Sequence, residues 1–155
     1  MADVDYDGMQ HAMAYLKTSR GVRPVRMKVP EPATTANILA AYEVALKRNP
    51  GIKLVLLTHV SNRNGLVLPV REIADMARRY EADVILDSAQ AVGLLSVDVA
   101  ALGIDFMGFS LHKWVAARSA PAESTFANHG LPISTLGSAT TSGQTAMFAP
   151  EHPLA

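Results

Sequence analysis

The chain has 155 residues, carries 14 basic and 14 acidic side chains and contains no cysteine. Balanced charge gives it no attraction for a polyanion or an anionic membrane, so we expect no nucleic-acid and no membrane partner. The absence of cysteine excludes disulfides, thiolate metal sites and a thiol nucleophile in this chain, and it fits a reducing compartment such as the cytoplasm.

The first third of the sequence predicts two helices separated by a short strand. Residues 5–18 have an amphipathic pattern that ends near Gly21 and places on one face Met9, Met13 and Leu16. Residues 22–29 alternate well enough for a short strand, in which Pro24 marks either the start of the strand or a sheet edge. The next helix begins after a threonine cap at residues 34–35 and ends at residues 49–51.

Strands and helices then alternate through the middle of the chain. Residues 52–58 are almost continuously aliphatic, which predicts a strand covered on both faces. A helix beginning at Pro69 and a strand over residues 83–87 follow. A short helix over residues 97–102 then leads to a strand over residues 105–109. This order predicts an α/β fold, a three-layer sandwich with a mainly parallel sheet and right-handed crossovers.

Polar side chains follow three of these strands. Asn62 lies in the loop after the first aliphatic strand, and Asp87 and Gln90 lie at the end of the second. The run after the third strand contains Ser110, His112 and Lys113. Because ligands bind outside the carboxyl ends of the strands in open parallel α/β sheets, we expect these side chains to share one rim.

The chemistry of this set predicts pyridoxal phosphate (PLP) as a cofactor. A desolvated amine such as that of Lys113 can act as a nucleophile toward a carbonyl cofactor. A buried carboxylate such as that of Asp87 can keep a pyridine nitrogen protonated, which makes the ring an electron sink. The other side chains can donate hydrogen bonds, Asn62 and Gln90 to the phenolate oxygen and Ser110 and His112 to the phosphate.

Each of these residues alone also has a purely structural explanation. An aspartate at a strand end most often forms a turn or caps a helix, and a single lysine is most often solvated. Asn62 lies in a good turn sequence whatever the function, and Ser110 can cap a turn. Gln90 can face water, and His112 can be an ordinary loop histidine. The prediction therefore depends on the conjunction of these residues at the ends of consecutive strands.

Residues 52–114 resemble the large-domain core of class V, fold-type I PLP-dependent enzymes, a family that contains cysteine desulfurases, small-molecule aminotransferases and isopenicillin N epimerase-like proteins. The motifs that carry the resemblance are His59-Val60-Ser61-Asn62, Asp87-Ser88-Ala89-Gln90 and Ser110-Leu111-His112-Lys113. Trp114 and the loop over residues 58–69 are most similar to the epimerase-like subgroup. The resemblance implies that Lys113 binds the cofactor aldehyde, that the substrate is an amino acid and that the full-length protein is a homodimer.

Residues 5–51 fit the preceding segment of the family more loosely, so we expect residues 1–114 to form a partial PLP-binding large domain, and members of the family are much longer. We expect no counterpart here of the phosphate-binding loop, of the aromatic or imidazole side chain that stacks on the cofactor, or of the arginine that pairs with the substrate carboxylate. Residues 115–155 are aperiodic and rich in alanine and serine, which predicts a divergent, poorly ordered tail of the kind that a frame change would produce.

We therefore expect a fragment of a PLP-dependent enzyme, of transferase or isomerase type, that acts at Cα of an amino acid and has little turnover in isolation. Cysteine desulfuration is the least expected reaction, because it needs a nucleophilic cysteine. The alternative is an inactive α/β remnant or interaction module that pairs its sheet edges with another chain. A nucleotide-binding doubly wound domain ranks last, because no Gly-x-Gly-x-x-Gly turn is present.

Overall fold

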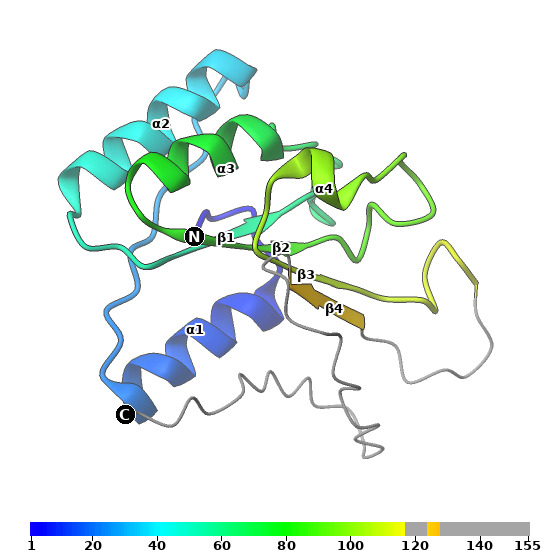
Figure 1. Cartoon of the computed structure of the whole chain (residues 1–155), viewed down its shortest axis with the longest axis horizontal. Helices are drawn as coiled ribbons and strands as arrows, with labels where there is room; N and C mark the ends of the chain where they lie inside the picture. The colour runs from blue at the N-terminus through cyan, green and yellow to red at the C-terminus, as the bar shows by residue number, and fades with distance from the viewer. Residues whose placement is uncertain (117–123, 128–155) are drawn as a thin grey trace.

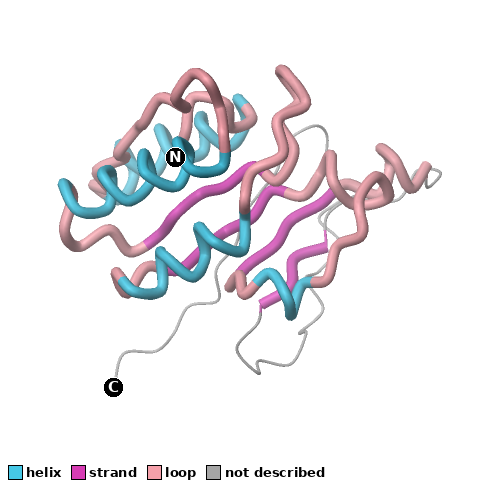
Figure 2. The backbone as a smooth tube through the Cα atoms, turned by 90° about the horizontal axis from the view of Figure 1, so that it is seen from above, coloured by secondary structure: helices cyan, strands magenta, loops and turns pink. Residues whose placement is uncertain are grey.

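The computed structural model describes residues 1–116 and 124–127, and their centre is a four-stranded sheet with the order β1-β2-β3-β4. Figure 2 shows the strands side by side. Three of them are parallel, namely β1 (Leu54–Thr58), β2 (Asp83–Asp87) and β3 (Phe106–Phe109). The fourth, β4 (Ser124–Ala127), is antiparallel to β3. The predicted α/β fold with a mainly parallel sheet is confirmed.

Helices lie on both faces of this sheet (Figure 1). One face carries α2 (Thr35–Arg48), α3 (Val70–Arg79) and α4 (Val99–Leu102), and the other carries α1 (Asp7–Arg20). The three predicted layers are therefore present. Within the described residues, no helix has the length and apolar character needed to cross a membrane.

Local sequence signals account for the helices that pack on the core. The Thr34 hydroxyl accepts a hydrogen bond from the Asn37 amide at 3.2 Å, which caps the start of α2. From there apolar residues recur at helical spacing, and α2 buries Ile38, Tyr42 and Leu46. In α3 the same spacing buries Ile73, Ala74 and Ala77. These side chains pack in one cluster with Leu57 and Leu86 of the central strands.

One expectation about the N-terminal part needs correction. Residues 22–29 do not form the predicted strand, because among the described residues their one ladder contact is a bridge between Met27 and Ala2. Pro24 lacks an N–H group, which further weakens any ladder there. The predicted leading helix is confirmed as α1, which ends at Arg20 and is capped by Gly21. Its one buried residue is Gln10, whose side chain donates to the Asp5 carbonyl at 2.7 Å. Its apolar residues are only half-buried, namely Met9, Met13 and Leu16.

The sequence does not predict β4. Its register with β3 pairs Phe106 with Ala127 and Phe109 with Ser124. Most of the predicted tail, residues 117–123 and 128–155, lies outside the described residues.

Candidate active site

The three parallel strands end in one row across the sheet. Thr58 pairs with Asp87, and Asp87 pairs with Gly108. The ladder continues past the strand ends, because the His59 amide donates to the Asp87 carbonyl at 2.9 Å and the Ser88 amide donates to the Gly108 carbonyl at 2.8 Å. The three loops that carry the predicted site residues therefore all leave the sheet at the carboxyl ends of its parallel strands, which form the rim that the sequence predicts.

Asp87 is the last residue of β2 and is half-buried at this edge. One of its carboxylate oxygens accepts a hydrogen bond from the Ala89 amide at 3.0 Å. Burial raises the pKa of Asp87, and the Ala89 hydrogen bond and the positive charge of Lys113 offset part of that rise. Within residues 1–116, the Ala89 amide is the only hydrogen-bond donor to this carboxylate, so its second oxygen is open to a further N–H group.

An aromatic ring lies beside Lys113. The lysine Nζ is 5.8 Å from the centroid of the Tyr6 ring, a distance typical of a cation–π contact. Tyr6 is held at the rim because its amide donates to the Thr58 hydroxyl at 3.3 Å. This contact is with Lys113, so the expectation that no aromatic or imidazole side chain here stacks on the cofactor stays a prediction. No local signal reveals the contact, since Tyr6 reads only as part of an amphipathic helix.

Gln90 is held by the residue that follows the lysine. Its side-chain oxygen accepts a hydrogen bond from the Trp114 indole N–H at 3.0 Å. The turn after β2 closely approaches Trp114, because a Cβ added at Gly93 in this turn would lie 3.0 Å from the Trp114 Cβ. The absence of a side chain at Gly93 therefore lets the lysine loop pack against the turn after β2.

The other predicted residues occupy the same loops without joining these contacts. Ser110 is buried just past β3, whereas Asn62 and His112 are exposed. In the described part of the chain, no hydrogen bond links the side chains of these three residues to the rest of the site. The structure thus places Asp87 within the electrostatic influence of Lys113, bonds Gln90 to Trp114 beside the lysine, and places the other three residues in the same loops.

A buried polar pair lies beneath the rim. The His59 ring nitrogen Nδ1 is 3.1 Å from the Ser88 hydroxyl, so the pair links the ends of β1 and β2. Burial lowers the pKa of His59, which favours the neutral imidazole. We therefore assign His59 to the support of the rim.

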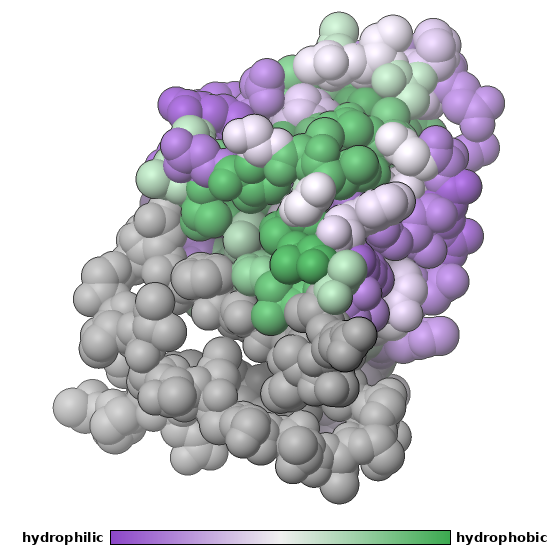
Figure 3. Space-filling view, turned by 90° about the vertical axis from the view of Figure 1, so that its right-hand side faces the viewer, coloured by the Kyte–Doolittle hydropathy of each residue, from purple (hydrophilic) through white to green (hydrophobic). Residues whose placement is uncertain are grey.

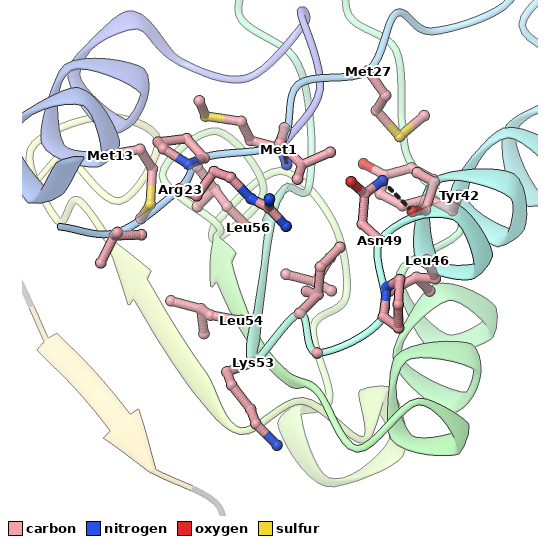
Figure 4. A pocket seen from close by; sticks show the side chains of 18 of the residues that line it. Met1, Met13, Arg23, Met27, Tyr42, Leu46, Asn49, Lys53, Leu54 and Leu56 are labelled. Carbon is pink, nitrogen blue, oxygen red and sulfur yellow. Dashed lines mark hydrogen bonds between the residues drawn. The ribbon is translucent and has the colours of Figure 1, made fainter.

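Apolar side chains also gather on this face of the molecule, which is the right-hand side of Figure 1 (Figure 3). Four exposed apolar residues belong to the loops after β2 and β3, namely Leu94, Leu95, Trp114 and Val115. A cavity of about 440 Å³ lies elsewhere, at the amino end of β1, where its lining includes Tyr42, Leu46 and Leu54 (Figure 4). This cavity contains none of the predicted site residues, so it is not the candidate site.

The family model that matches this sequence is Aminotransferase class-V, over residues 4–118. The chain belongs to this family. Isopenicillin N epimerase from Streptomyces clavuligerus is 30% identical to it over 118 residues, which are 76% of this chain and 29% of that protein. A cysteine desulfurase from Synechococcus elongatus is 51% identical over 61 residues, which are 39% of this chain and 10% of that protein.

Solved structures also share the fold. A mutant of C-DES with glycine covalently linked to its PLP cofactor has a TM-score of 0.70 and 27% identity, over 83% of this chain and 34% of that one. The complex of the cystine C–S lyase C-DES with cysteine persulfide has a TM-score of 0.69 and 28% identity. The predicted family and fold are confirmed, and this class-V chain spans between 10% and 34% of the length of these relatives.

Proposed function

We propose that this chain forms the cofactor-binding part of a PLP-dependent enzyme that acts at Cα of an amino-acid substrate. The observation that carries the proposal is the half-buried Asp87 carboxylate, which feels the charge of Lys113 at the rim where three parallel strands end. PLP needs such a carboxylate at its ring nitrogen and such an amine at its aldehyde. Within the class-V family, a carboxylate and an amine at the same row of strand ends support cofactor binding.

The residues present fit the cofactor. Within the described residues, one oxygen of Asp87 and the amino group of the Gln90 carboxamide make no hydrogen bond; the first suits a protonated ring nitrogen and the second a phenolate oxygen. Asn62 would donate to the same phenolate oxygen, while Ser110 and His112 would donate to the phosphate. When bound, PLP supplies a sink for the electron pair left by a broken bond at Cα. Lys113 would hold the aldehyde and, once a substrate amine has displaced it, would move a proton at Cα.

Among reactions at Cα, we favour an epimerase-like one. The match to isopenicillin N epimerase extends over 76% of this chain, whereas the match to the Synechococcus cysteine desulfurase extends over 39%. Epimerisation moves a proton from and to Cα, which is the chemistry a lysine amine beside that carbon performs. A racemisation assay by chiral chromatography, on the protein with PLP and single amino acids, would contradict this choice if only sulfur release or transamination appeared.

We also propose that the whole protein is a cytoplasmic homodimer. The exposed side chains of Leu94, Leu95, Trp114 and Val115 support an interface near the rim, because a partner would remove this apolar surface from water. Light scattering of the protein with and without PLP measures the mass directly. A monomer under both conditions would contradict the dimer.

An absorbance titration with PLP tests the cofactor proposal. We expect a visible band from the lysine-bound cofactor in the wild-type chain and its loss in Lys113→Ala. The matched control is Lys53→Ala, which removes an exposed lysine at the opposite edge of the sheet and should keep the band. A folded chain that gives no band, or a band that survives Lys113→Ala, would contradict the proposal and favour an inactive remnant or interaction module.

A further inference from the structure

We infer that Trp114 is a positioning residue that fixes the orientation of the Gln90 carboxamide, so that its amino group faces the proposed cofactor. The inference rests on the proposed function, since it concerns how Gln90 meets a phenolate oxygen. It adds a residue outside the predicted donor set and assigns it a role through Gln90 rather than through contact with the cofactor.

The chemistry of the indole decides which way the amide points. The Trp114 ring nitrogen carries one hydrogen and accepts none, so only the carbonyl oxygen of Gln90 can bond to it. The distance of 3.0 Å is that of an ordinary N–H to O hydrogen bond. The two hydrogens of the Gln90 amino group are then free of this contact. A phenolate oxygen only accepts hydrogen bonds, so it requires this orientation, and a flipped amide would bring two oxygens together.

The position of Trp114 is itself set by local contacts. The residue is 54% exposed, so core burial does not hold it. Its backbone instead packs against Gly93, where an added Cβ would lie 3.1 Å from the Trp114 carbonyl carbon. Trp114 directly follows Lys113, so one hydrogen bond and one close backbone contact fix the lysine loop relative to the turn that carries Gln90.

The first test reads the hydrogen bond without the cofactor. The chain has a single tryptophan, so its indole N–H gives one unambiguous signal in a proton–nitrogen NMR spectrum. We expect Gln90→Ala to shift this signal and to speed its exchange with solvent, because the acceptor is lost. Asn62→Ala is the matched control, since it removes an amide from a different loop and should leave the indole signal in place. An indole signal that is unchanged in Gln90→Ala would overturn the inference.

The second test is a double-mutant cycle on PLP affinity. Trp114→Phe keeps an aromatic ring and removes the hydrogen-bond donor. The Gln90 side chain must then lose conformational freedom when PLP binds, and we expect PLP affinity to fall roughly two- to tenfold. In the Gln90→Ala background the same change should have no further effect. Equal losses in both backgrounds would overturn the inference while leaving the cofactor proposal intact. Absence of the Lys113-dependent band in wild type would instead contradict the proposed function, and the NMR experiment would still decide the orientation of Gln90.

Discussion

Replacing Gly93 by alanine tests how closely the turn after β2 fits the lysine loop. Gly93 has a φ of +87°, a left-handed conformation that costs an L residue about 1–2 kcal/mol. The new Cβ would also lie 3.0–3.2 Å from Trp114 and Val115 atoms, two of which are backbone. Ordinary carbon contacts are about 3.5–4.0 Å, so the loop must move by a few tenths of an ångström. We expect the free energy of unfolding to fall by about 2–4 kcal/mol.

Gly51→Ala is a matched control for this change. Gly51 has the same φ of +87°, but an added Cβ there meets nothing within 4 Å. It lies just before β1, at the opposite edge of the sheet from the rim. We therefore expect Gly51→Ala to cost only the backbone strain, about 1–2 kcal/mol, and to leave PLP affinity unchanged.

Urea unfolding measures the stability difference between the two variants, and absorbance titration measures their PLP affinities. Gly93→Ala should lose more stability than Gly51→Ala and should alone weaken PLP binding, because it displaces Lys113. Equal losses of stability together with equal affinities would refute the close contact between the two loops.

Two further substitutions probe buried carboxylates. Burial raises the pKa of Asp87 above its ordinary 3.8, so the stability of the wild type declines as the pH rises from 3.8 through the folded-state pKa. Asp87→Asn removes the charge that burial disfavours, so this variant should unfold at a higher urea concentration than the wild type near neutral pH. This gain should vanish as the pH falls toward 3.8, and a gain that is constant with pH, or one shared by the exposed Asp83→Asn, would count against burial of the Asp87 charge as its cause. Asp5→Ala leaves the amides of Ala2 and Thr58 without the carboxylate that accepts from them at 2.6 and 3.1 Å. Urea unfolding should show that the free energy of unfolding falls by about 1–3 kcal/mol for each amide left unpaired. A variant as stable as the wild type would contradict this expectation and show that water replaces the carboxylate.

The central strands and the rim could be predicted from sequence because their signals are local. The aliphatic run at Val55 to Leu57 is buried on both faces, so it reads as a covered strand in any α/β context. Once the strands are known to be parallel, Asp87 and Lys113 must leave the sheet at the same edge. That is why the sequence could predict that the loops carrying these residues leave the sheet together.

The contacts that arrange the site could not be predicted in the same way. Tyr6 approaches Lys113, and Trp114 reaches Gln90, through pairings between distant parts of the chain that no periodicity encodes. The predicted strand over residues 22–29 shows the converse problem. Alternation indicates that a segment could form a strand, but only a neighbour with free backbone groups makes it one. Among the described residues the one bridge of this segment pairs Met27 with Ala2, where the Met27 amide donates to the Met1 carbonyl and the Asp3 amide donates to the Met27 carbonyl.

The central claim, that Lys113 is the residue to which the cofactor binds, is tested most directly by locating the bond. Borohydride reduces a C=N bond between a lysine amine and the PLP aldehyde to a stable C–N bond, and mass spectrometry of the digested chain then identifies the modified lysine. The exposed lysines serve as internal controls, namely Lys17, Lys28, Lys47 and Lys53. We predict modification of Lys113 alone at equimolar PLP. Modification spread over the exposed lysines, or an unmodified Lys113, would contradict the assignment.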